Sequence, residues 1–241
     1  LQKYPVDVQW VPDVLDLAFS PPRPKYWNGL LMVGFRDPAL DVSSRLVKRV
    51  FDLIISSVLL LLLSPLLIGI AMLVKITSKG PAIFKQTRIG ENGRPFTMYK
   101  FRTMFTGAEE QFYNMLRETE PGRYEYKSPN DPRVTPLGRW LRRYSLDELP
   151  QLYNVLRGEM SLVGPRPELP FFVDRYETWQ RKRFSVPPGM TGWWQVNGRS
   201  RLPMHQFVEY DLYYINNYSV LMDIRILLKT FISVITAEGA Y

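Results

Sequence analysis

The chain has 241 residues and carries 31 Lys and Arg against 23 Asp and Glu, which gives a formal net charge of +8. A chain of this length can bury a substantial core, and its basic balance suits nucleic acid, anionic lipid or phosphorylated substrates. The lack of cysteine excludes disulfides, Cys-ligated zinc and a thiol nucleophile, and the single histidine excludes a His-rich metal site. Acid–base or nucleophilic chemistry must therefore rest mainly on carboxylates.

The first 44 residues differ in composition from the rest of the chain. Six prolines interrupt them, while residues 6–11, VDVQWV, alternate like a short strand. Because the sequence begins at Leu1 and not at Met, we expect the chain to be a fragment or a processed product. We therefore treat residues 1–44 as a separate unit.

An apolar segment without a charged residue runs from Leu53 to Val74. A straight helix of this length would extend about 33 Å, which is enough to cross a hydrocarbon core of about 30 Å. Pro65 lies near its middle, where it removes a backbone donor, and Ser64 can bond to the carbonyl that is freed. The simple interpretation is a helix that spans the membrane, but Pro65 also favours a break in the helix at Ser64-Pro65.

The charges on both sides of this segment favour a re-entrant helix. Under the positive-inside rule, basic residues on both flanks place both ends on the cytoplasmic side. A helix broken at Ser64-Pro65, with arms of about 16 Å each, satisfies both flanks, whereas a spanning helix violates one. We therefore expect residues 45–80 to form a helix-break-helix anchor. The flanking cations are Lys48, Arg49, Lys75, Lys79, Lys85 and Arg88.

A β-hairpin is predicted after the anchor. Segments 82–89 and 94–104 flank residues 90–93, where Asn92-Gly93 is a strong hairpin signal. Lys100 and Arg102 alternate with apolar or aromatic neighbours, so they should share one face of the second strand. Two neighbouring cations can bind phosphate, but charges on a solvated edge strand give the same pattern.

Two adjacent carboxylates, Asp147 and Glu148, lie at the predicted start of a helix over Ser145–Leu156. Ser145 can act as the N-cap and Glu148 follows three residues later, as in a capping box. An acidic first turn is common in helices, but carboxylates among cations at a helix N-terminus also suit the handling of phosphate. Adjacent helical residues diverge by about 100°, so the two carboxylates should have different roles.

Several arginines surround the acid pair in the sequence. Arg142 precedes it, and Arg166 follows within Gly164-Pro165-Arg166-Pro167. An arginine between two prolines loses less entropy when it binds an anion, although the same segment can be a linker. We expect a helix over 168–184, a constrained loop over 187–192 and two amphipathic C-terminal helices suited to the core or the bilayer surface. Arg199, beside Gly198, is a further candidate phosphate or nucleotide contact.

Five motifs in this order resemble the bacterial sugar transferase family, the monotopic phosphoglycosyl transferases. They are KRVFDLIISS (48–57), Ser64-Pro65, GRPFTMYKFRTM (93–104), SLDELPQLYNVLRGEMSLVGPRP (145–167) and PPGMTGWWQVNGR (187–199). The resemblance implies an α-rich α/β membrane-associated domain with a re-entrant anchor, a small β-hairpin and amphipathic interfacial helices. It implies that residues 1–44 end a preceding Rossmann-like domain and include a linker. Residues 45–80 would be the anchor, marked by Lys48, Arg49, Ser64 and Pro65, and residues 81–241 the transferase domain.

The resemblance also implies a reaction, in which hexose-1-phosphate passes from a UDP-hexose to polyprenyl (undecaprenyl) phosphate and UMP is released. This would be the first membrane step of exopolysaccharide, lipopolysaccharide O-antigen or capsule synthesis, at the cytoplasmic face of the bacterial inner membrane. By resemblance, Asp147 is the nucleophile that forms a covalent phosphosugar and contacts the metal, and Glu148 positions the metal or assists proton transfer. Hard oxygen ligands point to Mg²⁺. The candidate phosphate-binding residues are Lys100, Arg102, Arg142, Arg166 and Arg199.

Two other classes of protein compete with this hypothesis. A non-catalytic membrane-surface scaffold of a polysaccharide assembly complex would explain the anchor and the charge, but it leaves the acid pair without a purpose. A nucleic-acid binder would explain the charge and the aromatics, yet the apolar segment and the lack of a nucleic-acid motif argue against it. We therefore expect UDP-hexose, polyprenyl phosphate and membrane lipid as partners, with no nucleic acid and with room for a homo-oligomer.

Overall fold

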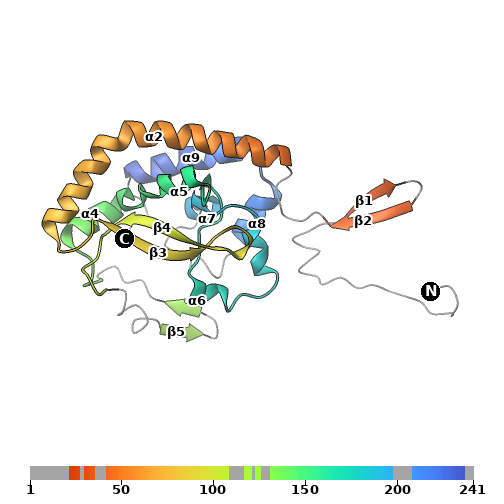
Figure 1. Cartoon of the computed structure of the whole chain (residues 1–241). Helices are drawn as coiled ribbons and strands as arrows, with labels where there is room; N and C mark the ends of the chain where they lie inside the picture. Colours follow the sequence, from red (N-terminus) through yellow and green to blue (C-terminus); the bar gives the residue numbers. More distant parts are fainter. Residues whose placement is uncertain are drawn as a thin grey trace.

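The computed structural model describes residues 42–108, 131–197 and 208–236 in full, together with the backbone of four strands within 22–35 and 117–125. Helices and short strands form one body beneath a long helix, α2 (Figure 1). In chain order the elements are β1 (Pro22–Trp27), β2 (Leu30–Phe35), α2 (Val42–Thr77), β3 (Ile83–Ile89), the 3₁₀ turn η1 (Glu91–Gly93), β4 (Pro95–Phe101), β5 (Arg117–Glu120), β6 (Arg123–Glu125), α4 (Pro136–Arg143), the 3₁₀ turn η2 (Leu146–Glu148), α5 (Gln151–Arg157), β7 (Ser161–Val163), α6 (Pro170–Val173), the 3₁₀ segment η3 (Gln180–Ser185), β8 (Gly189–Thr191), α7 (Trp193–Asn197), α8 (Val208–Asn216) and α9 (Val220–Thr236).

The N-terminal part contains a hairpin that the sequence did not lead us to expect. β1 and β2 pair antiparallel, from Pro22 opposite Phe35 to Trp27 opposite Leu30. The strand expected at residues 6–11 lies outside the described residues. The assignment of residues 1–44 to the end of a Rossmann-like domain stays a prediction.

The apolar segment forms one continuous helix, so the break expected at Ser64-Pro65 is wrong. α2 passes through Pro65 and changes direction as it crosses the top of the molecule (Figure 1). Pro65 has no N–H to donate to the carbonyl of Leu61, but the Ser64 hydroxyl donates to that carbonyl at 2.8 Å. Because this bond replaces the missing one, the helix bends without ending.

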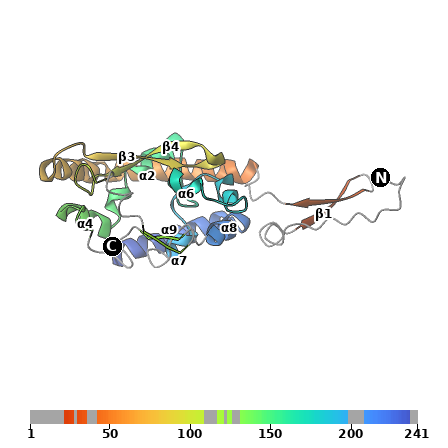
Figure 2. The ribbon, with the colours of Figure 1, turned by 90° about the horizontal axis from the view of Figure 1, so that it is seen from below.

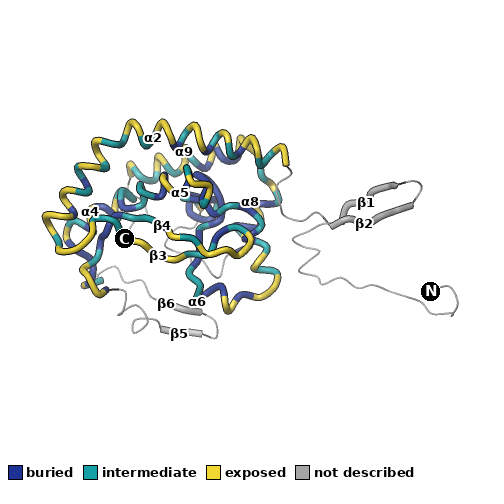
Figure 3. Tube along the Cα trace, viewed as in Figure 1, coloured by how far each residue is buried: buried dark blue, intermediate teal, exposed yellow. Residues whose placement is uncertain are grey.

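α2 presents its apolar side chains to its surroundings. Among the described residues it is the one helix long and apolar enough to cross a membrane. Figure 3 shows its outer side as exposed and its inner side as partly buried against the domain. Large side chains such as Leu61 and Leu62 are 76% and 68% exposed. An apolar surface of this size is expected to lie in lipid.

Two cations before the apolar segment bind protein groups and do not face lipid phosphates. Lys48 is 4% exposed, and its Nζ lies 2.7 Å from Oδ2 of Asp223 on α9. Arg49 donates to the carbonyls of Val155 and Leu156 at 2.6 and 2.8 Å, at the end of α5. Lys48 and Arg49 were expected to mark the membrane flank, which stays a prediction. In the structure they also hold α2 against the domain, because a buried cation requires a nearby acceptor.

The predicted hairpin is confirmed. β3 and β4 pair antiparallel from Ile83 opposite Phe101 to Ile89 opposite Pro95. Asn92 and Gly93 adopt φ values of 56° and 72°, in the left-handed region that these residue types tolerate best. This small antiparallel sheet positions Lys100 near the end of β4.

Two hydrophobic clusters hold the body together. The larger one joins the N-terminal half of α2 to α5, β7, α8 and α9, and the smaller one packs Ile70 and Val74 of α2 against Phe101 and Leu141. β7 and β8 pair in parallel inside the larger cluster. Seen from below, the β3–β4 hairpin and α9 lie on opposite sides of the molecule (Figure 2).

Two expectations for the C-terminal half have different outcomes. The single helix expected over 168–184 is divided into α6 and η3. The two amphipathic C-terminal helices are confirmed as α8 and α9. α9 buries Met222, Asp223 and Ile226 on one side and exposes Leu228 and Phe231 on the other. Such a helix suits the boundary between the domain and a bilayer surface.

Candidate active site

The acid pair lies in a 3₁₀ turn before α5, and not at the start of an α-helix as expected. Ser145 adopts φ 53°, and its side chain makes no capping hydrogen bond. α5 begins after Pro150, which is its N-cap residue and makes no side-chain capping hydrogen bond. The capping-box interpretation of Glu148 and the helix N-terminus argument for phosphate are therefore both wrong.

Glu148 is held by two of the predicted cations. Its Oε1 accepts hydrogen bonds from Nζ of Lys100 at 2.7 Å and from Nη2 of Arg166 at 2.9 Å. Burial alone would raise the pKa of Glu148, but Arg166 and Lys100 outweigh it and hold this pKa well below its usual range. Glu148 is therefore an ionised carboxylate in a fixed orientation.

Asp147 has a different environment from its neighbour. Its side chain is 8% exposed, and no residue in the described part of the chain donates a hydrogen bond to its carboxylate. Burial, followed by the charge of Glu148, raises its pKa, while Lys100, Arg142 and Arg166 oppose this rise. The two carboxylates thus differ in environment, as their divergent directions predicted. Asp147 remains available to bind or attack an electrophile.

The side chains of Arg142 and Arg102 bind different partners. Arg142 ends α4 and donates from Nε to Oγ1 of Thr103 at 2.9 Å, and its charge acts on Asp147. Arg102 donates from Nη2 to the carbonyl and hydroxyl oxygens of Ser78, at 2.8 and 2.9 Å. Arg102 therefore binds the residue that follows α2, whereas Lys100 binds Glu148. Arg199 lies outside the described residues.

The loop that carries Arg166 is fixed by its backbone. The N–H of Gly164 donates to the Thr191 carbonyl at 2.9 Å, and the N–H of Gly189 donates to the Pro165 carbonyl at 2.8 Å. A Cβ at Gly189 or Gly192 would collide with the backbone of Gly164. The close approach of these segments thus requires glycine, and it gives Arg166 a rigid base as predicted.

The carboxylates fit a metal that is bound mainly through substrate. Within the described ranges, no group of three or more His, Cys, Asp or Glu side chains could hold a metal ion. Glu148 is engaged by Lys100 and Arg166, so Asp147 is the member of the acid pair left to contact a cation. Mg²⁺ is commonly held by one or two carboxylates together with phosphate oxygens and waters, which is compatible with this donor set.

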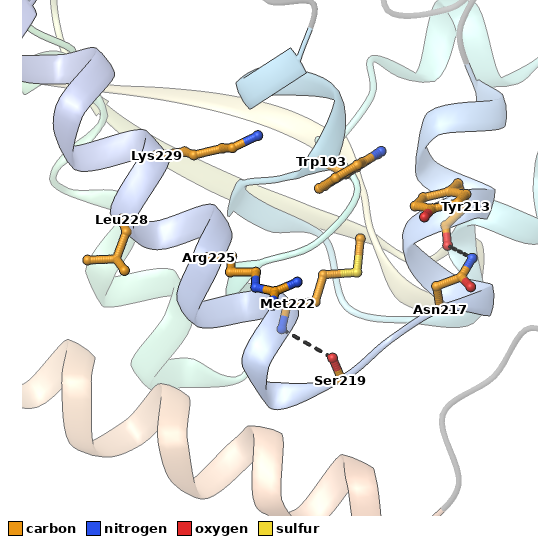
Figure 4. Close-up of a pocket in the computed structure, with 8 residues that line it drawn as sticks. All are labelled: Trp193, Tyr213, Asn217, Ser219, Met222, Arg225, Leu228 and Lys229. Carbon is orange, nitrogen blue, oxygen red and sulfur yellow. Dashed lines mark hydrogen bonds between the residues drawn. The ribbon is translucent and has the colours of Figure 1, made fainter.

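A groove of about 470 Å³ lies apart from the acid pair, between α7, α8 and α9 (Figure 4). In it Trp193 stacks on Tyr213 with ring centroids 5.5 Å apart, and Nζ of Lys229 lies 5.6 Å from the centre of the Trp193 ring. Neither carboxylate of the acid pair lines this groove. It is therefore a feature separate from the candidate active site.

Two charged residues that the sequence analysis did not identify as candidates, Arg183 and Glu168, lie behind the site. Arg183 is 1% exposed and Glu168 is 2% exposed. Arg183 donates to the Arg166 carbonyl, and Glu168 lies 3.8 Å from Arg183. Arg183 stands among other basic residues in the sequence QRKRF, so no local pattern distinguishes it as buried. Only its long-range contacts reveal it.

Comparison with known proteins shows the family to which the chain belongs. The family model of the bacterial sugar transferases matches residues 43–237, and the chain belongs to this family. It is 39% identical over 239 residues to UDP-glucose:undecaprenyl-phosphate glucose-1-phosphate transferase of Escherichia coli strain K12, a match that covers 96% of this chain and 49% of the relative.

Two further relatives show the range of the family. The chain is 43% identical over 204 residues to undecaprenyl-phosphate galactose phosphotransferase of Salmonella typhimurium strain LT2, covering 83% of this chain and 42% of that protein. It is 40% identical over 194 residues to the uncharacterized sugar transferase EpsL of Bacillus subtilis strain 168, covering 80% of this chain and 90% of EpsL. The chain spans about half the length of most of the curated relatives it matches.

Proposed function

We propose that this chain transfers hexose-1-phosphate from a UDP-hexose to polyprenyl phosphate and releases UMP, as the first membrane step of a surface polysaccharide pathway. The observation that carries the proposal is the pairing of Asp147, which is buried and accepts no hydrogen bond from the described residues, with a Glu148 fixed by Lys100 and Arg166. The relatives named as undecaprenyl-phosphate sugar-phosphate transferases support the class of donor and acceptor.

The proposed reaction proceeds in two displacements. A carboxylate oxygen of Asp147 attacks the β-phosphorus of the UDP-hexose, and the bond from this phosphorus to the bridging oxygen breaks, so that UMP leaves with that oxygen. A phosphate oxygen of polyprenyl phosphate then attacks the same phosphorus and displaces Asp147, which gives a polyprenyl diphosphate sugar. The ionised form of Asp147 and the polyprenyl phosphate both attack as anions, so neither displacement then needs a proton to be removed.

The surrounding residues have supporting roles in this proposal. Lys100, Arg142 and Arg166 provide positive charge where the phosphoryl oxygens gain negative charge in the transition state. Glu148 keeps Lys100 and Arg166 at fixed positions. When bound at Asp147, Mg²⁺ would supply Lewis-acid stabilisation of the diphosphate and of the leaving UMP.

Release of UMP tests this proposal. A panel of UDP-hexoses is incubated with polyprenyl phosphate and the chain in detergent or membranes, and UMP is quantified. Release of more than one UMP per protein molecule that requires both one UDP-hexose and the polyprenyl phosphate supports the transferase. A well-folded, membrane-bound protein that releases no UMP with any donor would instead support the scaffold alternative.

Arg166→Ala should lower the rate of UMP release at least about tenfold, which corresponds to ~1.4 kcal/mol or more of transition-state stabilisation. The reason is that Arg166 is one of two cations on Glu148 and stands on a rigid loop. Steady-state kinetics of the variant would be compared with those of Arg157→Ala, since Arg157 forms an ion pair with Glu159 on the surface. Wild-type activity in well-folded Arg166→Ala would show that Arg166 does not bind substrate and that its segment is only a linker.

We further propose that α2 is re-entrant, with both of its ends on the cytoplasmic side. Single cysteines at Val42 and Lys79, which are exposed positions beside the two ends, should then react with a membrane-impermeant thiol reagent from the same side. Position 79 is preferred to Ser78, because Ser78 accepts hydrogen bonds from Arg102. Labelling from opposite sides would refute the re-entrant arrangement. Pro65→Leu should shift the helix towards a straight, spanning form, detected by the same labelling.

A further inference from the structure

A buried arginine remote in sequence from the acid pair contacts the backbone of Arg166. Arg183 is 1% exposed, and its Nη2 donates to the Arg166 carbonyl at 2.8 Å. The same nitrogen lies 2.6 Å from Oδ2 of Asp211 on α8, and Nη1 donates to the hydroxyl of Tyr176 at 2.7 Å. The guanidinium thus connects three segments at one point.

Three consecutive carbonyls of the Arg166 loop each have a donor. The Pro165 carbonyl accepts from the N–H of Gly189 at 2.8 Å, and the Pro167 carbonyl accepts from Nη1 of Arg88 at 3.3 Å. Arg183 supplies the middle bond. Because Pro165 and Pro167 have no N–H of their own, hydrogen bonds to carbonyls are the main means of fixing this loop.

The orientation of the middle carbonyl affects the Arg166 side chain. A residue before proline is confined to extended conformations, so the direction of its carbonyl and the direction of its Cα–Cβ bond are closely coupled. Fixing the Arg166 carbonyl therefore fixes the direction in which its side chain leaves the backbone. That side chain ends 2.9 Å from Oε1 of Glu148.

We infer that Arg183 is a positioning residue, which acts through the Arg166 backbone to direct the Arg166 guanidinium towards Glu148 and the substrate phosphate. Asp211, Tyr176 and Glu168 hold Arg183 in turn, with Glu168 lying 3.8 Å from Nη1 of Arg183. The kinetic part of this inference rests on the proposed transferase function. The part of the inference that concerns the position of the Arg166 side chain does not depend on that function.

A double-mutant cycle tests whether Arg183 acts through Arg166. Arg183→Gln should lower kcat/KM for UMP release about tenfold when Arg166 is present, and less than about twofold in an Arg166→Ala background. Arg183→Lys should recover most of the loss, because an ammonium can still reach Asp211 and the Arg166 carbonyl. Equal effects of Arg183→Gln in both backgrounds would show a purely structural role and overturn the inference.

A second readout needs no catalysis. Phenylglyoxal modification of Arg166, mapped by mass spectrometry, should rise several-fold in Arg183→Gln, because Arg166 leaves Glu148. Asp223→Asn is the matched control: it also breaks a buried ion pair, with Lys48, but it does not contact the Arg166 loop. Unchanged modification of Arg166 in Arg183→Gln, or an equal rise in the control, would overturn the inference.

These readouts separate the two proposals. If the wild type releases no UMP, the proposed function fails, while the modification comparison still decides whether Arg183 positions Arg166. If Arg183→Gln does not fold, Asp211→Asn, which removes the charge of a carboxylate that holds Arg183, replaces it in both tests. Its effects should have the same direction and be smaller, and their absence in a folded variant would count against the inference.

Discussion

Asp147→Asn should abolish transfer and the formation of a covalent adduct. The substitution keeps the size of the side chain but removes the anionic oxygen that is proposed to attack phosphorus. With a UDP-hexose radiolabelled in the sugar and no acceptor present, the wild type should retain label on the protein after denaturation, and Asp147→Asn should not. UMP release with acceptor present should fall to the background of a reaction without protein.

Glu148→Gln is the matched comparison, because it neutralises the other carboxylate of the pair. It leaves Asp147 intact but weakens the hold on Lys100 and Arg166. This variant should be severely impaired in turnover, yet it can still accumulate some labelled protein. Turnover by Asp147→Asn, or transfer through a ternary complex without any adduct, would show that the two-displacement mechanism is wrong.

Removal of divalent metal should lower UMP release at least about a hundredfold, or ~2.7 kcal/mol in the activation free energy. The physical reason is that a diphosphate near the buried carboxylate of Asp147 and the partly buried carboxylate of Glu148 requires more positive charge than the nearby arginines and lysine supply. Activity after treatment with EDTA should return on addition of Mg²⁺ in excess of the chelator.

The binding of metal can also be followed without turnover. Mn²⁺ observed by electron paramagnetic resonance should bind more tightly with UDP present, since phosphate oxygens are expected to complete the coordination. Asp147→Asn should weaken this binding, and Arg157→Ala, as a surface control, should leave it unchanged. Full activity in EDTA, or equal Mn²⁺ binding by wild type and Asp147→Asn, would contradict the proposed metal role.

The elements that the sequence predicted correctly depend on short-range signals. The Asn92-Gly93 turn and its flanking strand formers predicted the β3–β4 hairpin, because these residue types favour the required backbone angles wherever they occur. The apolar run also predicted a helix of membrane-spanning length, and α2 is long and apolar enough to cross a membrane. Its contact with lipid stays a prediction. The hydroxyl–carbonyl bond of Ser64 is equally local.

The predictions that failed depended on competition between local and distant partners. Ser145 and Glu148 have the spacing of a capping box, but Glu148 instead binds Lys100 and Arg166, which are distant in the chain, and Ser145 turns into the left-handed region. The flank position of Lys48 likewise gave no sign that its Nζ lies 2.7 Å from Oδ2 of Asp223, 175 residues away. In both cases a buried charge gains more from a paired, desolvated contact than from its local alternative.

The sequence by itself determined which residue types could do the chemistry: carboxylates, with lysine and arginine around them, beside an apolar helix. Only the tertiary structure decided which of the candidate cations lie beside the acid pair and which have other partners. Lys100 and Arg166 meet at Glu148, Arg102 instead binds Ser78, and Arg183, which no local pattern distinguishes, lies behind Arg166. Composition shows which charges are present, but burial forces each charge to find a partner, and only the folded chain determines which partners are within reach.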